Sequence, residues 1–260
     1  MPRDNTILDM SALAAIADQQ QYQLLFATVS GAHLYGFPSK NSDIDLRGVH
    51  LLPLQEVVGL RVGTETLTRS WTQDGTEIDL VTHDAAKFFR LLLRRNGYVL
   101  EQVLSPLQVV TNEEHSELCE IARACVTRNH AHHYRGFANT QWELYAKTRK
   151  LKPLLYTFRV LLTGIRLMQT GEIEASLPAL LENSSAPAYL EDLIALKKND
   201  EHVRMAASDP AFETISADVD ALHRELDEAS IHSTLPDSPP RDVEIALHDL
   251  LLRLRLSPRR

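Results

Sequence analysis

The chain has 260 residues, of which 44% are apolar and 24% are charged, and its formal net charge is −8 at pH 7. No run of about 18 apolar residues is present, which excludes a helical membrane span, and the first residues lack the apolar core of a secretion signal. The two cysteines, Cys119 and Cys125, fit neither a disulfide framework nor the spacing of a zinc site. We therefore expect a cytoplasmic globular protein, without a membrane partner, of one large domain or two modest ones.

The first 110 residues show the pattern of a small mixed sheet with a few helices. Apolar spacing predicts helices over 6–20, 84–95 and 98–104. Alternating segments rich in β-branched residues predict strands, and Gly, Pro and Asn between them predict turns. The predicted strands cover 24–30, 44–51, 64–71 and 77–82, with a loop at 36–41 and a hairpin turn at 73–75.

Beyond Glu113 the apolar spacing is almost wholly helical. The predicted helices cover 113–127, 130–148, 151–170, 187–206, 216–229 and 241–256. The composition changes over 106–112, and we place a domain boundary there. The sequence thus predicts an α+β fold, in which residues 1–110 form a mixed-sheet domain and residues 111–260 an all-helical domain packed against it.

A pair of carboxylates, Asp43 and Asp45, stands at the start of the second predicted strand, after a glycine-containing turn. In a strand, residues two apart point to the same face, so both carboxylates project together. Two such groups repel each other unless a proton or a cation lies between them. A hard divalent ion such as Mg²⁺ binds carboxylate oxygens and keeps positions for substrate phosphates. The pair therefore predicts a divalent metal site.

A third acid, Asp79, lies between Ile78 and Leu80 in the strand predicted over 77–82. A neighbouring strand would bring Asp79 beside the first pair, which would provide three carboxylates for two metal ions. For an isolated acidic strand residue, the more common alternative is that Glu77 and Asp79 form the solvent face of an edge strand.

The segment 31–49 resembles the nucleotidyltransferases of the DNA polymerase β superfamily, and more narrowly the predicted bacterial and phage group associated with RNA repair and RNA ligases. The residues that carry this resemblance are Gly31, Tyr35, Gly36, Ser42, Asp43, Asp45, Arg47, Gly48 and Val49. The likeness covers roughly residues 25–170 and continues through Glu77–Asp79, with a weaker match at Lys152, Tyr156 and Arg159.

The resemblance implies an enzyme that transfers NMP from an NTP to a hydroxyl and releases pyrophosphate. It implies Mg²⁺ as cofactor, with Mn²⁺ as an alternative, and Asp43, Asp45 and Asp79 as the catalytic and metal-binding residues. The nucleotide-binding residues that it implies are Ser30, Gly31, Ala32, Tyr35, Gly36, Ser42, Arg47, Lys152, Tyr156 and Arg159. An RNA end is one acceptor; a protein or small-molecule hydroxyl and a degenerate module that only binds nucleotide are the alternatives. The oligomeric state stays open.

One residue departs from the superfamily pattern, because Ala32 stands where a serine hydroxyl usually helps to hold the triphosphate. Backbone N–H groups near Gly31, which has no Cβ to obstruct a phosphate, or the hydroxyl of Ser30 would have to replace that contact. We interpret the change as a modified phosphate cradle, while the loss of transfer activity is the alternative.

The charges are unevenly distributed along the chain. Residues 1–110 have a net charge of −3 and residues 181–260 of −7, whereas residues 123–166 carry nine basic side chains and one acidic one, a net of +8. A basic segment within an acidic chain predicts a local anion site, for a triphosphate, a polynucleotide backbone or both. The alternative for about half of these side chains is an ordinary solvated helix surface.

Overall fold

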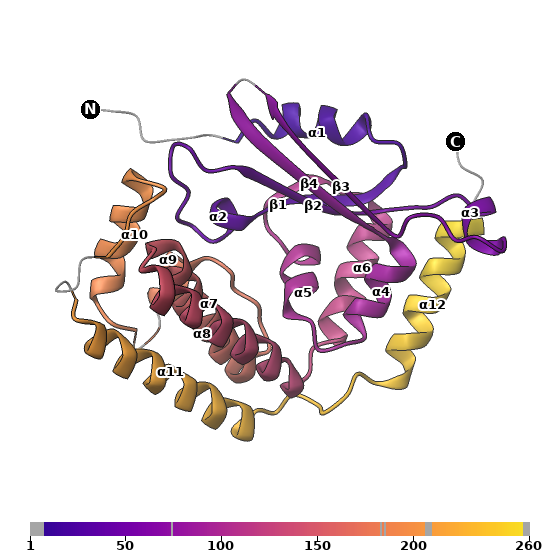
Figure 1. The fold of residues 1–260 in the computed structure, drawn as a ribbon. Helices are drawn as coiled ribbons and strands as arrows, with labels where there is room; N and C mark the ends of the chain where they lie inside the picture. The colour runs from indigo at the N-terminus through magenta and orange to yellow at the C-terminus, as the bar shows by residue number, and fades with distance from the viewer. Residues whose placement is uncertain (1–7, 74, 183, 185, 206–209, 257–260) are drawn as a thin grey trace.

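The computed structural model describes residues 8–73, 75–182, 184, 186–205 and 210–256, and it has the expected α+β fold. A five-stranded mixed sheet has the strand order β3-β4-β2-β1-β5 (Figure 1). The strands are β1 (Leu24–Ser30), β2 (Ile44–His50), β3 (Thr66–Gln73), β4 (Thr76–Asp84) and β5 (Gln108–Val110). β2 and β4 are parallel, while the other neighbouring strands are antiparallel. The four predicted strands are confirmed, with β3 shifted by two residues.

The strand β5 was not predicted, and it lies inside the segment 106–112 where the domain boundary was expected. Its pairing with β1 is continued by Leu107, whose carbonyl oxygen accepts hydrogen bonds from the backbone N–H of Val29 and the hydroxyl of Thr28. A three-residue strand of this kind depends on the free edge of a distant strand, so its own sequence gives little signal. The boundary between 1–110 and 111–260 stays a prediction.

The two faces of the sheet are covered by different helices. α1 (Met10–Asp18) covers one face, where Leu13 packs in a cluster with Leu46 and Leu80. α4 (Ala85–Leu92), α5 (Gly97–Val103) and α6 (Glu113–Ala124) cover the opposite face (Figure 1). Residues 6 and 7 of the first predicted helix lie outside the described residues.

The second half of the chain is helical, as expected, and is built around α8. Its elements are η1 (Arg128–His130), α7 (Ala131–Thr148), α8 (Leu151–Thr170), α9 (Leu177–Leu181), α10 (Tyr189–Asn199), α11 (Phe212–His232) and α12 (Arg241–Leu256). α7 and α11 both pack on the largely buried α8. The short helices α2 (Gly31–Leu34), α3 (Gln55–Val58) and α9 were not predicted as separate elements. Within the described part of the chain, no helix has the length and apolarity needed to cross a bilayer.

Two details of the predicted elements depend on residues outside the described ranges. The predicted hairpin turn at 73–75 includes residue 74, and the helix predicted over 187–206 includes residue 206. In the described part, Gln73 pairs with Thr76 across the hairpin, and the last helix of that region, α10, ends at Asn199.

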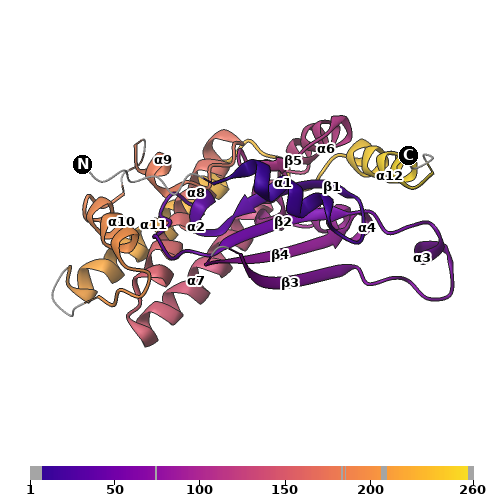
Figure 2. The same ribbon diagram turned by 90° about the horizontal axis from the view of Figure 1, so that it is seen from above.

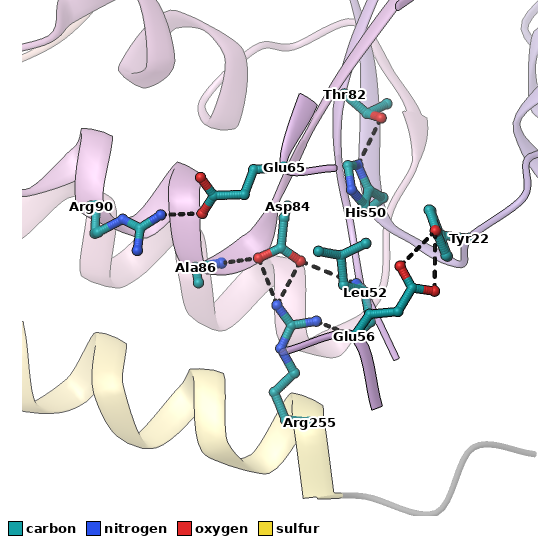
Figure 3. A network of polar contacts seen from close by, with 10 residues as sticks. All are labelled: Tyr22, His50, Leu52, Glu56, Glu65, Thr82, Asp84, Ala86, Arg90 and Arg255. Atoms are coloured by element: carbon teal, nitrogen blue, oxygen red, sulfur yellow. Dashed lines mark hydrogen bonds and ion pairs between the residues drawn. The ribbon is translucent and has the colours of Figure 1, made fainter. Parts of the chain in front are cut away.

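The strands of the sheet end in two different surroundings. Figure 2 shows α10 and α11 at one end of the sheet and α3 and α12 at the other. At the second end, Arg255 of α12 contacts Asp84, the last residue of β4, which also caps α4 through the N–H of Ala86 (Figure 3). The C-terminal helix is therefore attached to the sheet at the end remote from α10.

Candidate active site

Three of the predicted site residues lie in one row across the sheet. The strand register pairs Ser30 of β1 with Asp45 of β2, and Asp45 with Asp79 of the parallel strand β4. Residues directly opposite each other on neighbouring strands project from the same face of the sheet. Asp79 thus lies on the strand next to Asp45, as the sequence predicted, and on the face that α5 covers.

The carboxylate of Asp45 is paired with the guanidinium of Arg47, at 2.6 Å from Oδ1 to Nη2. The Nη1 atom of the same guanidinium donates to the backbone carbonyl of Asp79 at 2.8 Å, and Nε donates to the hydroxyl of Tyr98 at 3.3 Å. Arg47 therefore bridges β2 and β4 beside the two acids. It is close enough to the predicted site to influence the charge there. Pairing with one of the acids was one of the two roles that its place on the strand allowed, contact with the nucleotide being the other.

The turn before β2 depends on glycine at position 31. Gly31 has a φ of +61°, and a Cβ built on it would lie 1.9 Å from Oδ2 of Asp45. A side chain is therefore excluded at this position both by the backbone conformation and by the acid. The backbone of α2 begins here and passes directly against the carboxylate of Asp45.

The carboxylates of the candidate site are suitable ligands for a hard divalent cation, but in this structure they do not converge on one point. Among the residues that the structure describes, no three His, Cys, Asp or Glu side chains are grouped closely enough to hold a metal ion. The carboxylate oxygens on one face are the donor type that Mg²⁺ and Mn²⁺ prefer. Because Arg47 neutralises Asp45 here, a bound cation would compete with this guanidinium for Asp45.

Asp43 lies just before β2, at a cavity of about 620 Å³, a size typical of small-ligand sites. Burial raises the pKa of the Asp43 carboxyl, the negative charge of Glu77 raises it further, and the ammonium of Lys152 opposes both. Acidic side chains from the sheet and basic ones from the helical half therefore meet at this cavity. Its lining residues are Asn41, Asp43, Glu77, Gln141, Leu144, Lys150, Lys152, Pro153, Tyr156, Glu201 and His202.

Of the weaker predicted group on α8, Lys152 and Tyr156 line this cavity and Arg159 does not. Arg159 is fully enclosed, with Nη1 at 3.1 Å from Oε2 of the buried Glu101 and its guanidinium 3.8 Å from the ring centre of Tyr35. The expectation that Arg159 contacts the nucleotide is therefore not met. The spacing of seven residues places Arg159 on the same face of α8 as Lys152. Beyond Tyr156, however, this face is covered by the protein core.

Three residues of the glycine-containing turn are also shielded or closely packed. Ala32 and Tyr35 are buried, so their side chains form part of the core behind the turn. Gly36 has a φ of +83°, and a Cβ there would come within 2.6 Å of Pro178. These residues shape the turn, while the row of Ser30 and Asp45 presents side chains on the face of the candidate site.

Ser42, predicted to contact nucleotide, instead donates to Oε2 of Glu201 at 3.0 Å. Lys152, which lines the cavity, pairs with the other oxygen of Glu201 at 3.3 Å. The sequence analysis missed Glu201, and no motif surrounds it that would have revealed it. Glu77, which also lines the cavity, had been given no role in the site.

The basic segment 123–166 divides into two groups in the structure. Five of its nine basic residues pair with carboxylates away from the candidate site: Arg123 with Glu120, Arg128 with Asp237, Arg135 with Asp227, Arg159 with Glu101 and Arg166 with Glu172. The remaining four, Lys147, Arg149, Lys150 and Lys152, gather at the exposed turn between α7 and α8. The five paired residues therefore lie outside the predicted anion site, while an anion site at the four residues of this turn stays a prediction.

Two known proteins are similar to this chain. A protein from Methanocaldococcus jannaschii, described as Uncharacterized protein MJ0002, is 26% identical over 232 residues, which span 88% of this chain and 94% of that protein. A nucleotidyltransferase-like protein from Exiguobacterium sibiricum aligns with 97% of this chain and 79% of its own at 9% identity. Its TM-score of 0.30 is too low to support an inference.

The family comparison covers nearly the whole chain. Residues 7–253 match the model of RlaP, described as the RNA repair pathway DNA polymerase beta family. The match includes the row of acids, the glycine-containing turn and the helices that line the cavity. This chain therefore belongs to the RlaP family of DNA polymerase β-type proteins linked to RNA repair.

Proposed function

We propose that this protein is a metal-dependent nucleotidyltransferase, which transfers NMP from an NTP to a hydroxyl acceptor and releases pyrophosphate. The observation that carries the proposal is the register of Asp45 and Asp79 on adjacent parallel strands, with Asp43 at the neighbouring cavity. Membership of a DNA polymerase β-type family supports it.

In this proposal the three acids have distinct tasks. Divalent ions, when bound, offset the charge of the triphosphate and make the attacking hydroxyl a better nucleophile. Asp43 and Asp45 would bind the ions that contact the triphosphate. Asp79 lies nearest the acceptor hydroxyl and takes its proton. The hydroxyl oxygen forms a bond to the α-phosphorus, and the bond from that phosphorus to the pyrophosphate oxygen breaks. Lys152, on the helical wall of the cavity, stabilises the phosphate charge.

The phosphate cradle is the part that departs most from the superfamily pattern. Because Ala32 has no hydroxyl, we assign the serine contact to Ser30, which is buried like Ala32 but shares the row of Asp45. Gly31 is buried against the carboxylate of Asp45, so its backbone reaches a phosphate only when a cation draws that carboxylate away. The same features also support a second candidate, a module that binds nucleotide without transfer, since Arg47 already neutralises Asp45.

An RNA end is the acceptor that we favour. The family is linked to RNA repair, and the exposed side chains of Lys147, Arg149, Lys150 and Lys152 lie at the turn beside the cavity. A group of exposed cations attracts a polynucleotide backbone. In this group Lys152 also pairs with Glu201, and the guanidinium of Arg149 lies over the ring of Phe212. A protein or small-molecule hydroxyl remains the alternative acceptor.

The test is a labelled-nucleotide screen with the full chain. Each NTP carrying an α-phosphate label is incubated with Mg²⁺ or Mn²⁺, with RNA oligonucleotides bearing free hydroxyl ends, and with the protein alone. Label on RNA supports the proposal, whereas label on the polypeptide selects a protein acceptor. Binding of NTP without transfer under all conditions would establish the binding-module alternative, and the Asp45→Asn variant provides the background.

A further inference from the structure

The carboxylate of Glu201 joins the loop before Asp43 to the helical half, and the proposed function does not use it. Its Oε2 atom accepts hydrogen bonds from the hydroxyls of Ser39 at 2.7 Å and Ser42 at 3.0 Å. The same atom accepts from the ammonium of Lys197, one helical turn earlier, at the end of α10. Its Oε1 atom contacts Lys152 of α8 at 3.3 Å. One side chain thus receives four polar groups from three parts of the chain.

The ion pair between Glu201 and Lys197 differs from a surface ion pair because its lysine is buried. Lys197 is fully buried, and a buried ammonium is costly unless an opposite charge compensates it. Burial alone would raise the pKa of Glu201, but hydrogen bonds from Lys197 and Ser39 outweigh it and lower that pKa to about 2. The carboxylate is therefore ionised at neutral pH.

The two serines form a closed turn that ends at Asp43. The N–H of Ser39 donates to the hydroxyl of Ser42 at 2.9 Å, and the N–H of Ser42 donates to the carbonyl of Ser39 at 3.2 Å. Both serines are buried, whereas the next residue, Asp43, is exposed at the cavity. Glu201 therefore contacts both ends of the turn that leads into β2 and to Asp43.

We propose that Glu201 is a positioning residue for the candidate site. It fixes the turn over 39–42, and so sets the place of the Asp43 carboxylate, while it holds Lys152 on the opposite wall of the same cavity. The consequence for metal and nucleotide rests on the proposed function, but the restraint on the turn does not. The competing explanation is that Glu201 only attaches the loop to the helical half and contributes stability alone.

Two variants separate these explanations. Ser39→Ala removes one hydrogen bond to Glu201 and leaves its ion pairs in place, and Ser39 is not among the residues assigned to metal or nucleotide. The double variant Lys197→Met with Glu201→Gln removes the buried charge and its partner together, so no unpaired buried charge remains. Ser233→Ala is the matched control, since the Ser233 hydroxyl is also buried and donates at 2.7 Å to a carbonyl, that of Met168, remote from the cavity.

The measurements are the Tm, hydrogen exchange of the peptide spanning 36–45, and Mn²⁺ affinity by electron paramagnetic resonance, together with kcat and KM for NMP transfer. For both test variants we expect faster exchange in 36–45 and Mn²⁺ binding weakened by about tenfold, the size typical of groups that orient metal ligands. We also expect a lower kcat with a smaller change in KM. The Ser233→Ala control should lower the Tm by as much as Ser39→Ala does. It should leave the exchange of 36–45, the Mn²⁺ affinity and kcat unchanged.

Exchange and Mn²⁺ affinity equal to those of the Ser233→Ala control would overturn the positioning role, even if transfer activity is present. Conversely, if the wild-type protein transfers no NMP but the variants show the expected exchange and Mn²⁺ changes, the proposed function fails and the positioning role stands.

Discussion

The two ends of β4 carry acids in opposite circumstances. At the end of the strand, Asp84 is almost fully buried, and both of its oxygens contact Arg255, at 2.5 and 2.6 Å (Figure 3). It also accepts from the backbone N–H groups of Ala86 and Leu52. Near the start of the strand, Asp79 is half-buried, and within the described residues no side chain or backbone group donates a hydrogen bond to its carboxylate.

This difference indicates which acid is structural and which is available for chemistry. A buried carboxylate is stable only when hydrogen bonds and an opposite charge compensate its loss of water, as they do for Asp84. The carboxylate of Asp79 keeps its capacity to accept a cation or a proton. One strand therefore provides an attachment point for α12 and α4 at one end and a candidate catalytic group at the other.

The largest effect is expected at Asp79. Asp79→Asn should lower NMP transfer by on the order of 10²–10⁴-fold, because the amide cannot take the acceptor proton. The Tm should stay within a few degrees of the wild-type value, since no described group depends on this carboxylate. Single-turnover transfer and thermal unfolding measure the two quantities, and a variant that transfers NMP within tenfold of the wild-type rate would remove Asp79 from the mechanism.

At the other end of the strand the effect should be on stability. Arg255→Met leaves Asp84 buried without its counter-ion, so the free energy of unfolding should fall by about 3–5 kcal/mol. Urea unfolding measures this loss, and transfer per folded molecule should be unchanged. Adding Asp84→Asn should restore part of the stability, because the two residues form one pair. A purely additive loss would show that the ion pair is not what attaches α12.

The close approach of the turn to Asp45 is tested by Gly31→Ala. The positive φ costs about 1–2 kcal/mol for a residue with a Cβ, and the new atom must also displace Oδ2 of Asp45. Gly75→Ala is the control, because Gly75 has a similar φ of +81° with no atom within 4 Å of the added Cβ. By urea unfolding, Gly31→Ala should lose more stability than Gly75→Ala, because it adds the displacement of Asp45 to the cost of the positive φ, and only Gly31→Ala should lose transfer. If Gly31→Ala and Gly75→Ala transfer NMP equally well, the position of the Asp45 carboxylate does not matter for transfer.

Glu201, like Asp84, accepts polar contacts on both of its oxygens, and the loss of its contribution to stability should show only as the pH is lowered. Its pKa is about 2 in the folded protein and near 4.5 when unpaired, so its contribution to stability is complete above about pH 4.5 and is lost as the pH falls towards 2. The charged groups that face it are Lys152, Lys197 and Asp43. The stability difference between wild type and the Lys197→Met, Glu201→Gln double variant should shrink by on the order of 1–3 kcal/mol between pH 5 and pH 3. A stability difference that does not change with pH would show that pairing does not lower the pKa of Glu201.

The sequence was sufficient where the structure depends on local patterns. Alternation of side chains predicted the strands that carry Asp45 and Asp79, and apolar spacing predicted the long helices. The family resemblance, and not the alternation, favoured placing the two acids side by side. The sequence was insufficient where distant segments decide the outcome. Arg159 shares a helical face with Lys152, but Glu101 and Tyr35, from other elements, enclose it. Glu201 has no motif around it, and its contacts with Ser39 and Ser42 exist only once α10 meets the turn before β2.

The most direct measurement is a crystal structure of the protein with Mn²⁺ and a non-hydrolysable NTP, in which anomalous scattering locates the metal. We predict manganese in contact with the carboxylates of Asp43, Asp45 and Asp79, with the guanidinium of Arg47 displaced from Asp45. Nucleotide bound elsewhere, or an Asp79 carboxylate pointing away with no manganese near Asp45, would contradict the account.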